Sequence, residues 1–366
     1  MKKKRERFDK EKFDRLKLRS TIVAVIILCG VSAGSKLMPA SERLLDRWDM
    51  AVYDLAIKKL VIKPSSVEDI VSVPITAESL EFYRESEFGW PWPRELHGSL
   101  VKFCKTGGAK ALFFDLLFTD NSPYGPADDG VFAELVGEWN SVYLIGEFGK
   151  DKITKKDSYD ANLKKFSVPV TVNHPMKRTK EAQPETVRFP VRKIPDSVSH
   201  MCDPTVPTDF DGKFRRYYLI TELGGRYYLA PAAAMIWNLE GRGPIVVDKG
   251  WISIGRHRIP VDEEGAMLVK YYGEGFKVFA PVGPKSKRAT GAHCLVQDAS
   301  ALEEGRTPGI MPTELGGKIV IVGAYFPGND MKDTPVDHYY PGMEIGATAL
   351  ANILADDYMM EMPRIW

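Results

Sequence analysis

An almost uniformly apolar run, Ala111-Leu-Phe-Phe-Asp-Leu-Leu-Phe118, limits the folds open to this chain more than any other feature. A short run that is apolar on both alternating faces indicates a strand covered by helices on both sides, as in a parallel sheet. The preceding stretch Trp90-Pro-Trp-Pro-Arg94 forces extended or turning backbone and lets a helix begin, and Gly107-Gly108 can end that helix. Asp115 and Asp120 therefore stand near the carboxyl end of the strand, where ligands bind in such sheets.

Charge is divided unevenly along the chain. Residues 2–19 contain ten Lys and Arg against four Asp and Glu, whereas the whole chain has a formal net charge of only +1. The remainder is therefore slightly acidic. Nucleic-acid binding needs a basic face, so we expect no nucleic-acid partner.

An apolar segment, Thr21-Ile-Val-Ala-Val-Ile-Ile-Leu-Cys-Gly-Val-Ser-Ala-Gly34, follows the basic tail. The apolar stretch is close to the lower limit of about 17 residues for a membrane-spanning helix. Because the positive charge precedes it, we expect a cytoplasmic tail at 1–19, one inner-membrane helix at 20–39 and an extracytoplasmic or periplasmic domain at 40–366. The alternative is a cleaved signal peptide, although the leading region is long and contains acids.

Two glycines in this segment, Gly30 and Gly34, have the spacing at which membrane helices approach each other closely. We therefore predict a homodimer with these glycines in the membrane interface. The same residues match the nucleophile-elbow pattern, but that motif needs a strand before it and a helix after it. We assign no catalytic role to it.

Strand and helix signals alternate through the rest of the chain. This alternation predicts a mixed α/β fold, with a largely parallel sheet flanked by helices. We expect strands at 70–75, 110–118, 142–148, 214–220 and 317–323, helices at 41–62, 128–138, 227–238 and 341–356, an antiparallel excursion at 245–270, and an insertion or mobile loop at 150–200.

Four segments in order carry a resemblance to a known family. They are Trp90-Pro-Trp-Pro-Arg94, Gly108-Ala-Lys-Ala-Leu-Phe-Phe-Asp115, Asp209-Phe-Asp-Gly-Lys-Phe-Arg215, and Gly317-Lys-Ile-Val-Ile-Val-Gly323 with Asp330, Thr334-Pro335 and Pro341-Gly342. Together they resemble the second type of CHASE domain, the cyclase and histidine-kinase associated sensory extracellular family of bacterial receptors. The resemblance covers roughly residues 45–360.

The resemblance implies an external sensor behind one membrane helix. In the family, further membrane helices and a cytoplasmic nucleotide cyclase or kinase usually follow. This sequence stops at Met362-Pro-Arg-Ile-Trp366, so it is either a fragment of a receptor or a protein acting through a partner. It also has Val73-Pro-Ile-Thr76 where the family's first strand commonly carries an aspartate.

Acids at strand exits, with nearby basic and aromatic residues, are the candidate ligand-binding groups. For each acid the competing interpretation is structural, because Asp commonly caps helices and begins turns. The two tryptophans either line a recess or pack in the core. The candidates are Trp90, Trp92, Arg94, Asp115, Asp120, Asp209, Asp211, Arg215, Asp330 and Thr334.

Other chemistry finds little support in the sequence. The six histidines have no partners at zinc spacing, and no Ser-His-Asp set or phosphate-binding loop can be assembled. We therefore predict no metal, no cofactor and no enzymatic activity. The expected function is a sensor that binds an unknown small ligand or a partner and signals across the membrane. The alternative is an envelope scaffold in a larger membrane assembly, and an external hydrolase ranks last.

Overall fold

A computed structural model describes most of the chain beyond its N-terminal region. The described residues are 40–85, 88–151, 158–180, 182–191, 193–279, 291–326 and 328–360. Among them, no helix combines the length and the apolar character that a membrane crossing requires. The predicted tail, the predicted span at 20–39 and the predicted dimer face at Gly30 and Gly34 lie outside these ranges.

The chain divides into two compact units, Met1–Lys59 and Leu60–Trp366. Helix α2 (Ala40–Leu60) corresponds to the helix predicted at 41–62 and contains all the described residues of the first unit. The second unit contains every strand and all the other helices that the structure describes.

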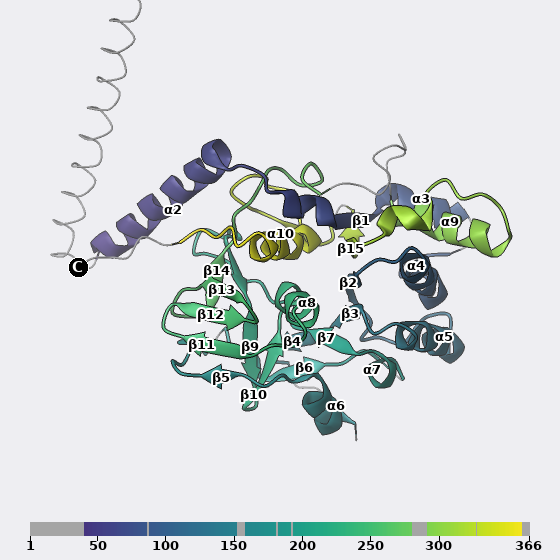
Figure 1. Cartoon of the computed structure of the whole chain (residues 1–366), viewed down its shortest axis with the longest axis horizontal. Helices are drawn as coiled ribbons and strands as arrows, with labels where there is room; N and C mark the ends of the chain where they lie inside the picture. Colours follow the sequence, from purple (N-terminus) through teal and green to yellow (C-terminus); the bar gives the residue numbers. More distant parts are fainter. Residues whose placement is uncertain are drawn as a thin grey trace, which may run out of the picture. The chain divides into compact units, whose positions relative to one another are not determined.

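A five-stranded parallel sheet forms the centre of the second unit (Figure 1). Its order in space is β1 (Ile70–Thr76), β15 (Ile319–Tyr325), β2 (Ala111–Leu117), β3 (Val142–Ile145) and β7 (His200–Cys202). The last of these strands in the sequence, β15, lies between the first two, in register with both. The predicted parallel sheet is therefore confirmed.

Helices cover both faces of the sheet (Figure 1). We call the two sides the helical-core face and the α10 face. The helical-core face carries α3 (Ala77–Glu85), α4 (Arg94–Thr106), α5 (Pro126–Gly137) and α9 (Ala292–Glu303), and the α10 face carries α8 (Pro231–Leu239) and α10 (Gly342–Leu354).

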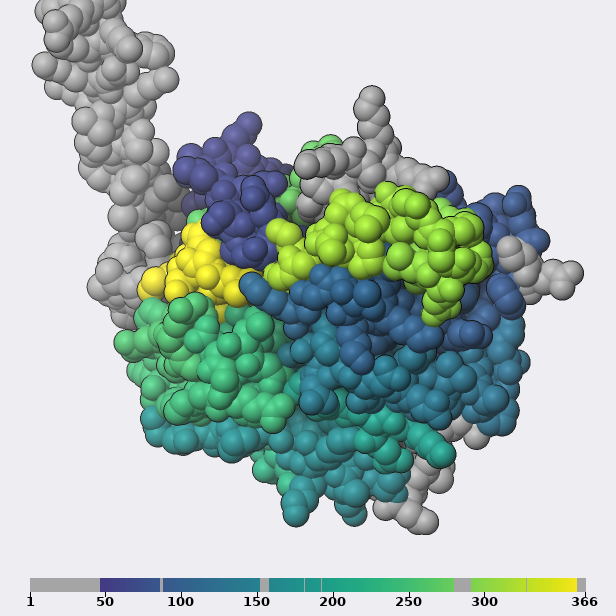
Figure 2. Space-filling view, turned by 45° about the vertical axis from the view of Figure 1, so that its right-hand side comes forward, coloured from purple at the N-terminus to yellow at the C-terminus, as the bar shows by residue number. Residues whose placement is uncertain are grey.

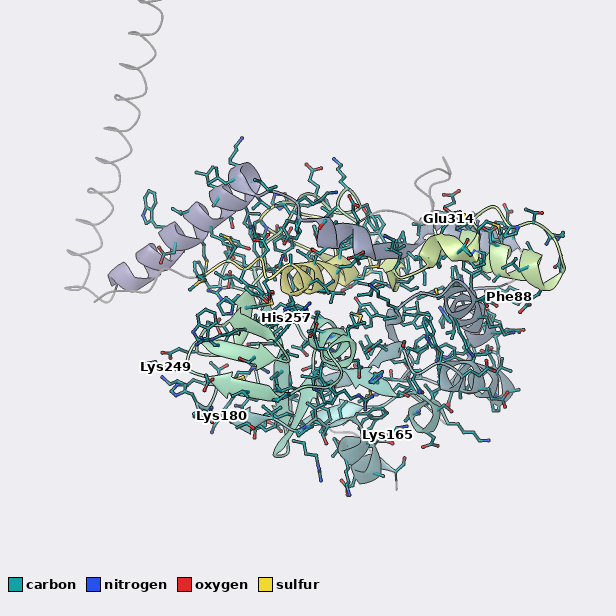
Figure 3. All side chains as sticks on the ribbon, viewed as in Figure 1. Phe88, Lys165, Lys180, Lys249, His257 and Glu314 are labelled. Carbon is teal, nitrogen blue, oxygen red and sulfur yellow. The ribbon has the colours of Figure 1, made fainter. Side chains whose placement is uncertain are left out.

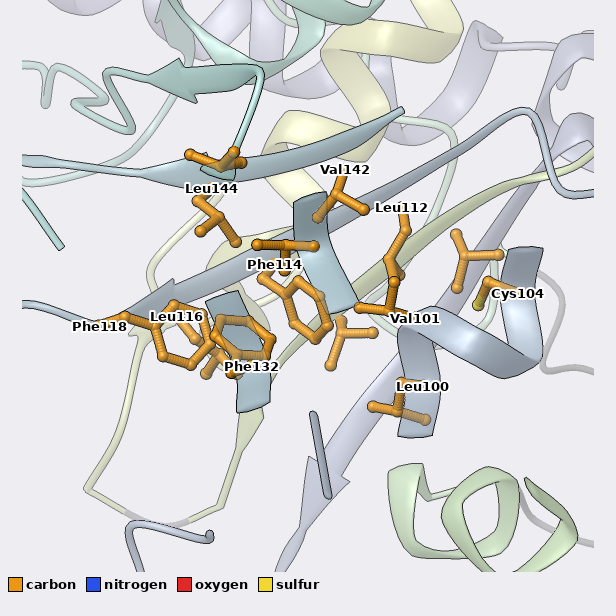
Figure 4. Packing of buried hydrophobic residues seen from close by; sticks show 14 of the residues in the cluster. Leu100, Val101, Cys104, Leu112, Phe114, Leu116, Phe118, Phe132, Val142 and Leu144 are labelled. Atoms are coloured by element: carbon orange, nitrogen blue, oxygen red, sulfur yellow. The ribbon is translucent and has the colours of Figure 1, made fainter. Parts of the chain in front are cut away.

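The helical-core face is packed with apolar side chains (Figure 4). Alternate residues of each strand point to this side, and Leu112, Phe114 and Leu116 of β2 meet helix residues such as Val101 and Phe132. In Figure 2 the light-green residues near 300 lie directly against the blue residues near 100. This packing joins segments that are far apart in the sequence, because α4 and α9 are neighbours.

Smaller elements surround the sheet. The antiparallel excursion predicted at 245–270 is confirmed, since β11, β12 and β13 pair antiparallel. The bounds are η2 Ser65–Asp69, β4 Glu147–Gly149, α6 Tyr159–Phe166, β5 Thr171–Val172, β6 Thr186–Arg188, α7 Ile194–Ser197, β8 Arg216–Tyr218, β9 Ile220–Leu223, β10 Arg226–Leu229, β11 Ile245–Asp248, β12 Trp251–Ile254, β13 His257–Pro260, β14 Ala266–Leu268, η3 Pro312–Leu315, β16 Met331–Lys332 and β17 Tyr340–Pro341.

Two segments differ from the simplest reading of the sequence. The helix expected at 227–238 begins only at Pro231, because residues up to Leu229 pair with β9 as strand β10. In the stretch expected to be an insertion or mobile loop, the described residues form short elements between β3 and β7. Several of their side chains, such as Phe166 and Ile194, are buried in the main core.

The antiparallel excursion is tied to the end of α10 by a buried histidine. His257, labelled in Figure 3, begins β13 and has its Nδ1 2.7 Å from Asp356 Oδ1, just beyond α10. The three cysteines in the described ranges, Cys104, Cys202 and Cys294, are buried and stand outside any disulfide bond.

Candidate functional site

The carboxyl ends of β2 and β15 form a switch point of the sheet. The chain leaves β2 toward α5 on the helical-core face, whereas it leaves β15 toward α10 on the opposite face. Loops that depart to opposite sides leave a crevice between neighbouring strands, which is where open parallel sheets bind ligands. The topology alone therefore selects this edge.

Asp115 lies at this edge on the α10 face. It is in register with Gly323 of β15, whose missing side chain makes room for Met343 of α10. The pKa of Asp115 is raised to about 7, mainly by burial and also by the negative charge of Asp330, while Lys332 opposes the increase. Asp330 and Lys332 form an ion pair with Oδ1 and Nζ 2.8 Å apart.

Asp330 occupies an unusual position at the start of α10. Its φ of 37° lies in the left-handed region that non-glycine residues seldom adopt. Its carbonyl accepts a hydrogen bond from the amide of Gly342, the first residue of the helix. A side chain at position 342 would collide with the Asp330 carboxylate, so this acid lies at the helix N-terminus. The helix dipole favours a negative charge there.

Sequence reasoning missed Glu344, a fully buried residue in the first turn of α10. Its Oε2 accepts a hydrogen bond from the amide of Phe276 at 2.9 Å. Its pKa is raised to about 7, mainly by burial and also by the charge of Asp337. The Phe276 amide and the Ser72 hydroxyl limit this increase. Glu344 is the only charged residue in an apolar helix, and that isolation was the available signal.

The Ser72 hydroxyl of β1 faces the same carboxyl without a well-formed hydrogen bond. Neither Ser72 Oγ nor Glu344 Oε1 has a partner of hydrogen-bonding geometry among the described residues. Buried polar atoms without partners are rare in folded proteins and call for an explanation.

The aromatic candidates separate into one core residue and one edge residue. Trp92 is 1% exposed and packs in the helical core, which makes it structural. Trp90 is 39% exposed, and its ring centroid lies 5.6 Å from that of Phe326, the residue after β15. Trp90 is therefore at the candidate edge, on the side of the helical core.

Arg94 holds loops together from inside the protein. Its Nε lies 3.2 Å from Oδ1 of the buried Asp129, and its Nη2 donates to the Asp120 carbonyl at 2.7 Å. Its guanidinium also covers the Phe118 ring at 4.6 Å. The Asp120 side chain points elsewhere, to Arg188 of β6 at 2.9 Å, and is well exposed. Neither residue joins the Asp115 group.

Asp209, Asp211 and Arg215 form an ion-pair cluster that braces the edge. Arg215 Nη1 lies 3.0 Å from Asp209 and 2.8 Å from Asp211. Hydrogen bonds from Arg215 are the main reason that the pKa of Asp211 is lowered. The cluster reaches the edge through Phe214, whose amide donates to the Asp333 carbonyl at 2.8 Å.

Thr334 stabilises a turn in the loop after β15. It is buried, and its hydroxyl donates to the carbonyl of Asp337 at 2.9 Å and accepts from the Asp337 amide at 3.1 Å. Of the sequence candidates, Asp115 and Asp330 are close enough for the charge of one to raise the pKa of the other. Thr334 and the Asp209–Arg215 cluster stabilise the loop between β16 and β17, which follows Asp330 in the sequence.

Other kinds of site find little support. In the described ranges, no His, Cys, Asp and Glu side chains are arranged to hold a metal ion. A groove of about 150 Å³ is lined by other elements, among them Trp251, Leu268 and Met360. Its one charged lining residue, Asp262, is paired with Arg216 at 3.1 Å. We therefore place the candidate site at the switch point and not in this groove.

Comparison with known families assigns the chain. Residues 22–366 match the CHASE2 domain family, and the chain therefore belongs to that family. CHASE2 domains are extracellular sensory domains and not catalytic ones, which is consistent with a sensory role. No curated protein and no solved structure matches the chain.

Proposed function

We propose that this chain is a membrane-anchored extracytoplasmic sensor that transmits a signal to a nucleotide cyclase or a kinase. The observation that carries the proposal is the CHASE2 match over residues 22–366. The basic tail followed by an apolar segment supports a single membrane helix at 20–39 with the N-terminus in the cytoplasm.

The cue binds, in this proposal, at the carboxyl ends of β2 and β15. Asp115 and Asp330 offer carboxylate oxygens, and Lys332 offers a cation, at the point where α10 begins. An ammonium group of a small zwitterion would suit the two acids, since opposite charges within a few ångströms favour each other.

Helix α10 is suited to carry the signal toward the membrane side of the chain. The Ser66 hydroxyl donates to the Ala351 carbonyl of α10 at 3.0 Å, and Lys63 Nζ donates to the Val278 carbonyl at 3.2 Å. Lys63 and Ser66 follow α2 closely in the sequence. A cue that binds one placement of α10 more tightly shifts the population of these contacts.

A topology experiment tests the anchored arrangement. A reporter enzyme that is active only outside the cytoplasm is fused after Ala40 and, separately, after Asp357. Both fusions are expected to be active, and a control fusion after Arg19 is expected to be inactive. A cytosolic reporter after Ala40 would overturn the proposal.

The proposed dimer has its own test. Replacing Gly30 and Gly34 together by leucine is expected to lower the yield of crosslinked dimer in membranes, because the helices lose their close approach. An unchanged yield would remove the glycine interface and leave the sensor proposal standing.

A thermal-shift screen of the full chain tests the ligand edge. Single amino acids and small amines are the probes, since binding to the folded state raises the melting temperature. A shift that disappears in Asp115→Asn but persists in Asp120→Asn supports the edge. A shift that is unaffected by Asp115→Asn contradicts it.

One observation favours a second candidate, a scaffold that binds another protein. Phe88, Trp90 and Tyr124 are each 37–40% exposed, and the rings of Phe88 and Tyr124 lie 5.9 Å apart (Figure 3 labels Phe88). Exposed aromatic side chains are enriched at protein interfaces. Crosslinking in the native membrane that recovers only this chain would contradict the scaffold.

A further inference from the structure

The first turn of α10 contains a carboxyl in a setting that is poor for a charge. Glu344 is fully buried, and one of its two oxygens has no hydrogen-bond partner among the described residues. A carboxylate needs donors for both oxygens when it is removed from water, whereas a neutral carboxylic acid needs fewer. The geometry therefore favours the protonated form.

Each element packed against this carboxyl contributes a defined group. Strand β1 contributes the Ser72 hydroxyl, and the loop segment 274–279 contributes the Phe276 amide. The loop before α10 contributes the Asp337 carboxylate, which repels a second negative charge. Tyr340 is buried in the same region, and its hydroxyl bonds to Thr348 and not to Glu344. Among these side chains there is no cation to compensate the charge.

The contact between Glu344 and Phe276 lies in a tightly fitted part of the fold. Phe276 has a φ of 57°, which is costly for an aromatic residue. Its ring lies 4.1 Å from the Tyr325 ring at the end of β15. The preceding Gly275 approaches Pro341 so closely that a side chain could not be accommodated. Residues 275–276 therefore clamp the start of α10 against the sheet.

We propose that Glu344 is a proton-binding site that latches α10, so that external pH is a cue for this domain. The proposal rests on the sensory function and adds protons as a second input beside the small ligand. In the latched state the carboxyl is neutral and buried beneath Phe276. When the O–H bond breaks and the proton passes to solvent water, the charge favours an opening in which water reaches the carboxylate.

The direction of the response follows from the chemistry. Burial raises the pKa of Glu344 from its usual 4.5 to about 7. Protons therefore bind the latched state better than the open state, and acidification stabilises the latch. Opening would release the 274–278 segment, whose Val278 carbonyl accepts from Lys63, a residue that follows α2 in the sequence. Near neutral pH, a small change would shift the population of latched molecules.

Hydrogen–deuterium exchange of the full chain in detergent micelles tests the latch. Peptides covering 274–279 and 342–348 are followed between about pH 5 and pH 9, with exchange corrected for its intrinsic pH dependence. We expect protection in wild type to fall at least about tenfold as pH rises through neutrality. In Glu344→Gln, which is neutral at every pH, we expect protection to stay nearly constant.

Two further variants keep the interpretation specific. Ser72→Ala removes the hydroxyl that lowers the Glu344 pKa, so the transition should move to higher pH. His338→Gln removes an exposed titratable group that is paired with Asp333 on the same loop, and it should leave the transition unchanged. If Glu344→Gln does not fold, the Ser72→Ala shift alone decides. Wild-type protection that does not depend on pH, or a transition that survives in Glu344→Gln, would overturn the latch.

This result is independent of membrane topology. A cytosolic reporter would remove the sensor proposal while leaving the exchange data intact, and a failed latch would leave the topology intact. The two proposals therefore fail separately.

Discussion

The two faces of the central sheet are built from alternate residues of the same strands, yet their chemistry differs. On the helical-core face β2 presents Leu112, Phe114 and Leu116, all of which are buried among apolar neighbours. On the α10 face the same strand presents Asp115, and β1 presents Ser72 toward Glu344. On the helical-core face these strands bury only apolar side chains. On the α10 face there are buried acids, and a charge on them destabilises the fold.

The helical-core face therefore provides stability, and the α10 face provides sensitivity to pH and to nearby charges. Apolar burial depends little on pH or ligands and holds the layers together. Buried carboxyls near their own pKa make the energy of the α10 face depend on protons and on nearby charges. A sensory domain needs both, and here a two-residue alternation along the strand supplies them.

The largest effect is expected on the helical-core face. Phe114→Ala removes a fully buried ring and should lower the free energy of unfolding by about 3–5 kcal/mol. Chemical denaturation of the full chain measures the change. The control Leu117→Ala alters a side chain that is 48% exposed on the same strand and should change it by less than about 1 kcal/mol. Equal losses would erase the distinction.

Next in size is the buried ion pair at the edge of the core. Arg94→Ala leaves the carboxylate of Asp129 buried without its cation, and we expect a loss of about 3 kcal/mol in the same measurement. Arg84→Ala is the matched control, since its pair with Glu81 is exposed and should contribute less than about 1 kcal/mol. A negligible loss for Arg94→Ala would mean that water already reaches Asp129.

A smaller, pH-dependent effect is expected on the α10 face. The pKa of Asp115 is raised from 3.8 to about 7 in the folded protein, so the native state binds an extra proton between those values. Stability from this group is full below about pH 4 and is lost as pH rises through about 7. Asp115→Asn should therefore match wild type in acid. At about pH 8 the variant should be more stable than wild type by about 1–2 kcal/mol, since it carries no buried charge. The gain is not larger because the Asp115 side chain is partly exposed and solvent screens its charge.

Denaturation curves at several pH values check this prediction. Lys332→Met is the companion variant. Removing the cation should raise the Asp115 pKa further and move the loss of stability to higher pH. If Asp115→Asn had the same free energy of unfolding as wild type at every pH, the charge of Asp115 would not destabilise the folded protein.

The smallest effect is expected at Asp120, which the sequence places beside Asp115 but the fold does not. Its side chain is exposed and pairs with Arg188 across the surface. Asp120→Asn should change the free energy of unfolding by less than about 0.5 kcal/mol at any pH. A larger effect would show that Asp120 belongs with the edge acids after all.

Much of the central fold could be predicted from local sequence. The apolar runs of β2 and β15 gave both parallel strands, and Gly107-Gly108 marked the end of α4, whose last residue is Thr106. The start of α8 was misplaced, because Tyr227 to Leu229 pair with β9 and this hairpin depends on a turn at Gly224-Gly225. Short strands that depend on such pairings leave weak periodic signals.

The site was predictable only in part. Asp115 and Asp330 were identifiable as acids near strand ends, and the charge of Asp330 does raise the pKa of Asp115. Arg94, Asp209 and Arg215 were equally conspicuous, but their charges are used within internal ion pairs. The sequence alone does not show which acids form an ion pair in the folded protein and which do not. Glu344 escaped because a carboxyl in an apolar helix gains meaning only when its neighbours are known.

The position of β15 has a consequence for biogenesis. Strand β1 is made first, but the described strand that pairs with it in the sheet is β15, which emerges from the ribosome after the other four strands of that sheet. Before β15 is made, the backbone N–H and C=O groups of β1 and β2 that pair with it have no strand to bind. They can then pair with other chains. Nascent chains ending before Tyr325 should therefore remain protease-sensitive and depend on chaperones, with maturation concentrated in a single late event.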